Sequence, residues 1–145
     1  GRPVGAESLH IPLNLVGEFD THPDVAISLA TEAASKVFMR PFTVALDRLA
    51  TWQGPPGQRP LVLCGDEGAV GVDRLYDAIQ RALADVGLSA GEKPETVAHM
   101  TIARGVAQQA EEDISPIRWR VREFDLVLTP PGDPRHVLQR WALDD

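Results

Sequence analysis

The order of strand-like and helical segments along this sequence predicts an α+β domain built mainly on antiparallel sheet. Two segments of helical period each follow a strand-like segment, and the strand-like segments near the C-terminus are joined by links of hairpin length. The chain has 145 residues, 43% of them hydrophobic, which suits one compact domain and is short for two. We therefore expect residues 1–145 to form a single domain.

The first part of the chain predicts a helix between two strands. Leu9 to Leu15 alternates apolar and polar residues, which is typical of a strand with one buried face. A helix should follow, with Asp20 or Thr21 as its N-cap and Pro23 in its first turn. Its apolar stripe recurs every four residues to about Phe38, at Val25, Leu29, Ala33 and Val37. A second strand is expected over residues 42–46.

Glycine and proline punctuate the middle of the chain. Residues 51–57 predict a loop, and 61–64 a short buried strand. The clearest apolar stripe of helical period runs from Val72 to Val86, and Gly87 suits the C-cap position that follows. Residues 89–95 predict a second loop.

The C-terminal part reads as strands joined by turns. After a polar and acidic segment at 105–115, one long strand is expected over 119–128. The apolar alternation changes phase near residues 123–124, which predicts a bulge there. A turn at 129–134 should lead into a last strand at 136–143.

Composition excludes several classes of protein. The net charge of −7 argues against an extended track for nucleic acid, which needs a row of Lys and Arg, although it permits a pocket for one nucleotide. No apolar run approaches the roughly 20 residues of a membrane span, and no metal-binding motif occurs. Cys64 cannot form an internal disulfide and should be a small buried hydrophobe. Without a signal-peptide pattern, a cytoplasmic location is expected.

Two histidines project from the polar faces of strongly alternating segments. His10 lies in the segment His-Ile-Pro-Leu, and His99 in His-Met-Thr-Ile, where His99, Thr101 and Ala103 should share one face. Either histidine alone is more often an ordinary surface residue. Their occurrence in two halves of similar layout hints at an internal duplication and favours a common function.

A pair of histidines suits the opening of a cyclic phosphodiester. One group must take a proton from the attacking water and another must give one to the departing oxygen, and histidine can do both near neutral pH. Thr101 could donate to a non-bridging phosphate oxygen, and Arg104 could add a charged donor. Asn14, on the face of His10, could lend its amide.

These residues resemble two motifs of the 2H phosphoesterases. The segment HMTIAR is similar to the second motif of that family, and SLHIPLNLVGE to the first, which commonly reads His, any residue, Thr, Leu and an apolar stretch ending in Gly-Glu. The tail from Pro116 to Leu143 and the spacing between the motifs also fit. The resemblance is to the bacterial LigT-like RNA 2′,3′-cyclic phosphodiesterases, also called 2′-5′ RNA ligases, and covers roughly Arg2 to Leu143.

The resemblance implies a two-lobed fold with antiparallel sheets around a central cleft, helices outside and His10 and His99 on the floor. It implies hydrolysis of RNA-type 2′,3′-cyclic phosphate ends to 2′-phosphates, and a capacity for 2′-5′ ligation. His10 would be the acid and His99 the base, with Thr101, Arg104 and Asn14 binding phosphate. No metal or other cofactor is implied. The expected ligand is an RNA end or a nucleotide, and the protein is expected to be a monomer.

Three departures from the family pattern bear on function. Pro12 replaces the threonine of the first motif, and Leu15 stands where a phenylalanine is common. The strand and helix that usually precede the first motif are missing, so we expect a truncated domain. Two alternatives remain open: a nucleotide- or RNA-binding module that lost turnover through Pro12, and a phosphodiesterase for another small cyclic phosphate. Trp52 is expected to pack in the core or at its rim.

Overall fold

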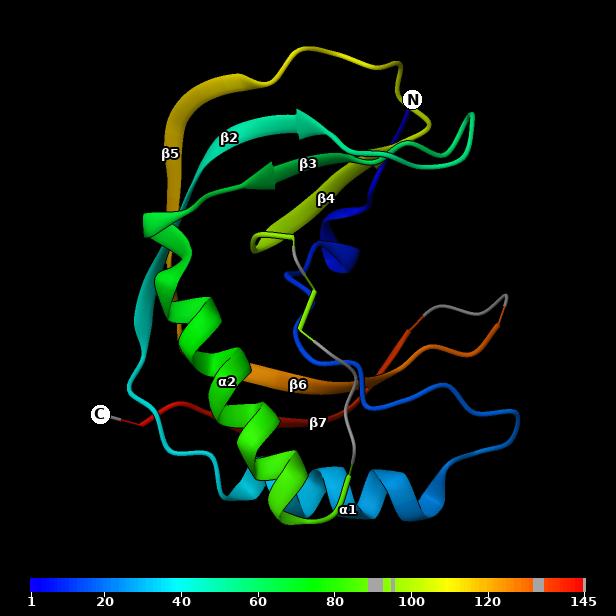
Figure 1. Ribbon diagram of the computed structural model, residues 1–145, viewed down its shortest axis with the longest axis vertical. Coiled ribbons are helices and arrows are strands. Elements are labelled where there is room, and N and C mark those ends of the chain that lie inside the picture. Colours follow the sequence, from blue (N-terminus) through cyan, green and yellow to red (C-terminus); the bar gives the residue numbers. More distant parts are fainter. Residues whose placement is uncertain (89–92, 95, 132–134, 145) are drawn as a thin grey trace. The chain divides into compact units, whose positions relative to one another are not determined.

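The computed structural model describes residues 1–88, 93–94, 96–131 and 135–144 (Figure 1). In these residues two helices and seven strands follow one another, which confirms the predicted α+β class with antiparallel pairing. The elements are β1 (Arg2–Pro3), α1 (Asp24–Ser35), β2 (Phe42–Thr51), β3 (Leu61–Cys64), α2 (Val70–Asp85), β4 (His99–Arg104), β5 (Glu112–Val121), β6 (Glu123–Leu128) and β7 (His136–Ala142).

The chain divides into two compact units. The first comprises Gly1–Leu13, Thr43–Asp73 and Pro94–Trp119, and the second comprises Asn14–Phe42, Arg74–Lys93 and Arg120–Asp145. Within the described part of the chain, neither helix is long and apolar enough to cross a membrane.

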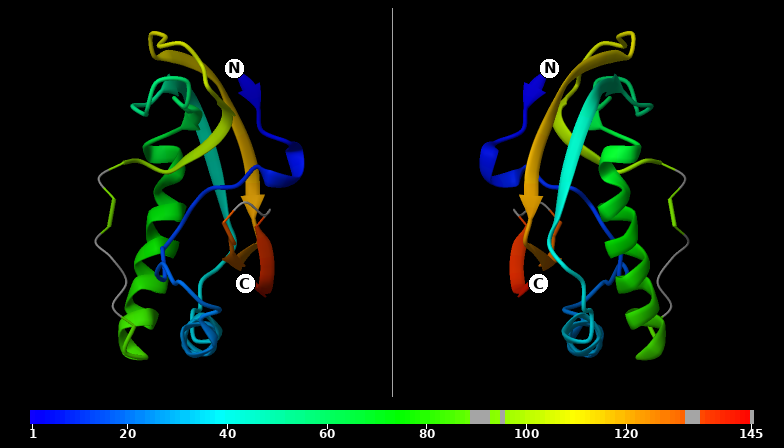
Figure 2. Two further views of the ribbon diagram at one scale, coloured as in Figure 1. Left: turned by 90° about the vertical axis from the view of Figure 1, so that its right-hand side faces the viewer. Right: turned by 90° about the vertical axis from the view of Figure 1, so that its left-hand side faces the viewer.

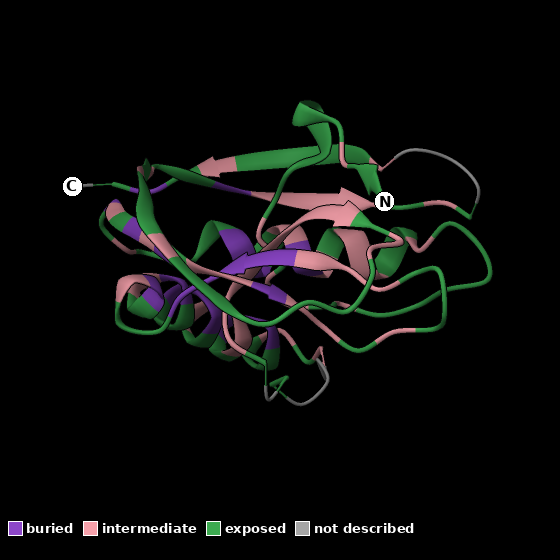
Figure 3. Ribbon diagram, turned by 90° about the horizontal axis from the view of Figure 1, so that it is seen from above, coloured by how far each residue is buried: buried purple, intermediate pink, exposed green. Residues whose placement is uncertain are grey.

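The first unit is organised by a five-stranded sheet in the order β1-β4-β3-β2-β5. Val44, Leu46 and Val62 are fully buried, and Cys64 is 1% exposed, which confirms that the thiol behaves as a small core residue (Figure 3). Burial raises the pKa of the Cys64 thiol, so the reactive thiolate is scarce near neutral pH.

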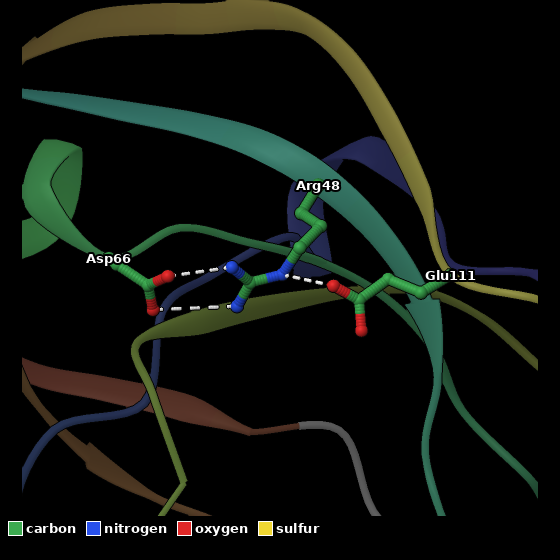
Figure 4. A network of polar contacts seen from close by, with 3 residues as sticks. All are labelled: Arg48, Asp66 and Glu111. Atoms are coloured by element: carbon green, nitrogen blue, oxygen red, sulfur yellow. Dashed lines mark hydrogen bonds and ion pairs between the residues drawn. The ribbon is translucent and has the colours of Figure 1, made fainter.

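Arg48 joins three segments of the first unit (Figure 4). Its guanidinium, on β2, donates to Asp66 beyond the end of β3 through Nη1 at 2.7 Å and Nη2 at 3.5 Å. Its Nε lies 2.9 Å from Oε1 of Glu111, just before β5. The hydrogen bond from Arg48 holds the pKa of Asp66 below its usual range.

The second unit is built on helix packing. Ala30 and Ala33 of α1 form a buried cluster with Ala82 and Leu83 of α2, and small side chains at these positions allow close approach. Figure 2 shows α1 nearly end-on beside the last turns of α2. The predicted cap is confirmed, because Gly87 has a φ of +85° and ends the helix in a left-handed turn.

A hairpin of β6 and β7 completes the second unit, as the hairpin-length link predicted. Phe124 stacks on Trp141 across the two strands, with 5.6 Å between ring centroids. Of the predicted loops, residues 89–92, 95 and 132–134 lie outside the described residues.

The strand expected over residues 9–15 does not form. One edge of β4 pairs with β3, and the other is taken by β1 and by the amide of Val4, which donates to the carbonyl of Ile102 at 2.9 Å. Pro12 offers no N–H to a ladder in any case. The segment carrying His10 is therefore irregular and follows a short 3-10 helix, Ala6–Ser8.

The long strand expected over 119–128 is two strands. The chain leaves β5 at Arg122 and enters β6, which belongs to a different sheet. The change in apolar phase at residues 123–124 thus marks a change of sheet rather than a bulge. β5 also begins at Glu112, within the segment predicted only as polar and acidic.

The first helix begins later than predicted. Its N-cap is Pro23, with no side-chain capping bond, and neither Asp20 nor Thr21 fills that role. Val25 is 74% exposed, so the predicted stripe fails at its first residue. Ala33 is buried against α2 and Val37 packs on the same cluster, which confirms the later part of the stripe, and Ala30 adds to it.

The Arg48–Asp66 pair should make stability depend on pH. An aspartate whose pKa is lowered on folding stabilises the fold above its ordinary pKa of about 3.9, and this contribution disappears as the pH falls through the lowered value. Asp66→Asn should therefore lower the Tm at pH 7, and the difference from wild type should shrink below about pH 4. Asp47→Asn, an exposed site on β2, is the matched control, and a constant difference across the pH range would contradict this origin.

Candidate active site

His99 opens strand β4 and is half-buried. Its Nδ1 lies 3.2 Å from the carbonyl oxygen of Val97, two residues earlier. The indole of Trp52 covers the imidazole, with ring centroids 4.4 Å apart and planes inclined by 54°. His99 is therefore held by a backbone acceptor on one side and an aromatic ring on another.

His10 is held in the same way by a different kind of segment. It is exposed, and its Nδ1 lies 2.7 Å from the carbonyl oxygen of Ser8, again two residues earlier. The sequence therefore placed His10 wrongly on a strand, but the local arrangement of its ring matches that of His99. Both histidines lie in the first unit.

The two carbonyl contacts determine how each neutral ring is protonated. A carbonyl oxygen can only accept a hydrogen bond, so each Nδ1 must carry the hydrogen. The Nε2 of each neutral ring then has a free lone pair, and in the described part of the chain neither Nε2 has a partner. Each histidine can thus accept or return a proton at Nε2 while Nδ1 fixes its orientation.

Burial lowers the pKa of His99. The carbonyl of Val97 opposes this effect, and the positive charge of protonated His10 adds to it. A lowered pKa keeps His99 neutral at pH 7, which is the state that a general base requires.

Thr101 shares the face of His99 on β4. His99 pairs with Cys64 and Thr101 pairs with Val62 in the antiparallel ladder to β3, and paired residues point to the same side of a sheet. Thr101 is half-buried, as His99 is. This is the arrangement that the motif predicted for these two residues.

A β-bulge in β4 brings Arg104 to the same face. The register shifts by one residue, so that Val62 pairs with Thr101 but Leu61 pairs with Ala103. Because Leu61 and Val62 point to opposite faces, Ala103 lies on the face opposite to Thr101. The prediction that Ala103 shares the face of His99 is thus wrong, and Arg104 takes that side instead.

Asn14 is engaged elsewhere. Its amide nitrogen donates to the carbonyl oxygen of Tyr76 at 3.2 Å and to Oε1 of Gln80 at 2.9 Å, both on α2. Both amide hydrogens are therefore used within the second unit, and the shared strand face that suggested a phosphate contact does not exist. These hydrogen bonds support a structural role for Asn14, in which it anchors the irregular segment that follows His10 to α2.

Trp52 is the site residue that sequence reasoning undervalued. It follows β2 directly, and it packs on the buried cluster of Ala50, Val62 and Cys64 as the sequence predicted. Its contact with His99 was not foreseen, because it depends on the β2-β3-β4 pairing. In the described residues, no group of three or more His, Cys, Asp and Glu side chains is arranged to hold a metal ion.

Comparison with known proteins identifies the family of the chain. Residues 2–132 match the model of the 2′-5′ RNA ligase superfamily, and the chain belongs to that family. The resemblance to LigT-like 2H phosphoesterases is thereby confirmed.

Individual relatives support the same assignment. The RNA 2′,3′-cyclic phosphodiesterase of Escherichia coli K12 is 28% identical over 148 residues, which cover 99% of this chain and 80% of that protein. The ligand-free crystal structure of Escherichia coli LigT is 25% identical with a TM-score of 0.73, covering 100% of this chain and 81% of that one. The LigT complex with 3′-AMP is 27% identical with a TM-score of 0.70, covering 100% and 82%.

The contact with Trp52 should help to keep the pKa of His99 low. Trp52→Ala exposes the imidazole to water, so the pKa of His99 should rise toward its ordinary value, as measured by NMR titration of the ring protons. Trp52→Phe keeps an aromatic ring over the histidine and should retain most of the effect. An unchanged pKa in Trp52→Ala would show that the rest of the sheet alone accounts for the burial.

Proposed function

We propose that this chain hydrolyses RNA-type 2′,3′-cyclic phosphates to 2′-phosphates, in the cytoplasm, through His10 and His99. Water attacks phosphorus, the bond from phosphorus to O3′ breaks, and the product keeps its phosphate on O2′. His99 accepts a proton from the water at Nε2, and His10 gives the proton from its Nε2 to the departing O3′. Formation of a 2′-5′ linkage between RNA ends belongs to the same proposal, because it breaks the same bond from phosphorus to O3′.

The matched carbonyl contacts of the two histidines carry this proposal. Ser8 and Val97 each fix the Nδ1 of a histidine two residues later, and two otherwise dissimilar segments thereby present Nε2 for proton transfer. The lowered pKa of His99 supports its assignment as the base. Family membership and the 28% identical phosphodiesterase support the reaction class.

The phosphate would be held from the face of β4 that carries His99. The hydroxyl of Thr101 would donate to a non-bridging oxygen, and the guanidinium of Arg104 would supply charged donors. Both residues would stabilise the charge that develops on phosphorus oxygens. Asn14 is left out of this set, since its amide hydrogens already have acceptors on α2.

A binding module without turnover is the second candidate, and Pro12 favours it. This residue is exposed and has neither a hydroxyl nor an N–H, so the first motif offers the phosphate no donor at the position that corresponds to Thr101. LigT structures with 3′-AMP, ATP and NADP+ show that the fold in that protein accommodates nucleotides. Nucleotide binding without hydrolysis of a cyclic phosphate would select this candidate.

Removing either imidazole should abolish most of the activity. His10→Ala and His99→Ala should each reduce hydrolysis of 2′,3′-cyclic AMP by at least ~10²-fold, the usual contribution of general acid or base catalysis. EDTA should be present throughout, because neither proton transfer needs a metal. His22→Ala and His136→Ala are matched controls at exposed positions and should keep full activity. Full activity in either catalytic variant would remove that histidine from the mechanism.

Restoring the hydroxyl of the first motif should accelerate the reaction. Loss of one oriented donor typically costs about 10²–10³ in rate, so Pro12→Thr should raise kcat for the same substrate. Pro12 lies outside any strand and is exposed, so the replacement should fold. In Pro12→Val the side chain has nearly the shape of threonine but no hydroxyl, so kcat should not rise. Equal kcat values for wild type, Thr and Val variants would show that this hydroxyl has no part in the reaction.

A further inference from the structure

Strand β1 places a second arginine beside Arg104. In the antiparallel ladder of β1 and β4, Arg2 pairs with Arg104 and Pro3 with Ala103. Paired residues share a face of the sheet and lie about 5 Å apart at Cα. Arg2 is therefore on the side of the sheet that carries Arg104, Thr101 and His99.

The bulge in β4 turns both arginines to the face that carries Thr101. Without the extra residue, Arg104 and its partner Arg2 would point away from Thr101. With it, two guanidinium groups stand at the end of the face on which the proposed phosphate site lies. Arg2 is one strand spacing, about 4.8 Å, further from β3 than Arg104 is.

Two like charges directly opposite each other in a ladder repel, so the arrangement calls for an anion. Both arginines are exposed, and in the described part of the chain neither has an ion pair or a side-chain hydrogen bond. The chain as a whole is acidic, with 21 Asp and Glu against 14 Lys and Arg, yet among the described residues no Asp or Glu forms an ion pair with either arginine. By contrast, Arg48 in the same unit has two carboxylate partners.

We propose that Arg2 and Arg104 together form a binding site for a second phosphate of the substrate. This inference rests on the proposed function. Arg104 would contact the cyclic phosphate beside Thr101, and Arg2 would contact the phosphodiester of the preceding nucleotide. The substrate class is then an RNA 3′ end of at least two nucleotides, rather than a free cyclic mononucleotide. A guanidinium suits this ligand, because its planar donors match two phosphate oxygens.

The test compares one-phosphate and two-phosphate ligands. Equilibrium binding of adenosine 2′-monophosphate and of the dinucleotide ApA with a 2′-phosphate end is measured for wild type and Arg2→Gln. We expect Arg2→Gln to weaken the dinucleotide about tenfold and to leave the mononucleotide unchanged. The slope of log K against log salt for the dinucleotide should fall by about one, as loss of one phosphate contact requires.

Arg81→Gln removes the same charge from an exposed position on α2 and serves as the matched control. It should leave the affinities of both ligands unchanged. Equal weakening of both ligands by Arg2→Gln, or the same loss in Arg81→Gln, would overturn the site by showing a general charge effect. No loss in Arg2→Gln would also overturn it.

Binding requires no turnover, so this result is separable from the proposed catalysis. A wild type that binds the dinucleotide through Arg2 and hydrolyses no cyclic phosphate would keep the two-arginine site and reject the enzyme. If the wild type hydrolyses 2′,3′-cyclic AMP and its affinity for the dinucleotide does not depend on Arg2, the enzyme is kept and the two-arginine site is rejected.

Discussion

The backbone pairing of β4 on both of its edges is the constraint on which the site depends. β3 on one side and β1 on the other determine which way each residue of His99–Arg104 points. The ladder to β3 aligns His99 and Thr101, and its one-residue shift adds Arg104 to them. Since β3 also pairs with β2, the same hydrogen-bonded series brings Trp52 onto the imidazole. The chemistry of the site follows from backbone register more than from side-chain packing.

The sequence predicted the parts of this fold that rest on local physics. The second helix and its glycine cap follow from an apolar stripe and a residue that tolerates positive φ, and both formed as expected. The buried strand ending at Cys64 was equally predictable, because a short apolar run next to a loop is typical of a buried strand. The two histidine motifs could be found for the same reason, since each is contained in a few consecutive residues.

What the sequence could not predict depends on partners far along the chain. The alternating segment around His10 has the pattern of a strand, but the free edge of β4 is taken by β1. The phase change at Glu123 resembles a bulge locally and is a change of sheet in the structure. The true bulge lies in β4, where no break in the sequence pattern marks it, because it is visible only in the pairing with β3. The hydrogen bonds of Asn14 could not be predicted for a similar reason, since its acceptors are on α2.

The position of the single cysteine has a practical consequence. Cys64 is 1% exposed and lies in a buried cluster on which Trp52 and Val97 pack, so a thiol reagent can reach it only when this packing opens. Its rate of modification would report how often the packing over Cys64 opens, in the same way that amide exchange reports local opening. With no other cysteine in the chain, the signal would come from this one position, which is the ladder partner of His99. The protein thus contains a native chemical probe for local opening under Trp52, the residue that also covers His99.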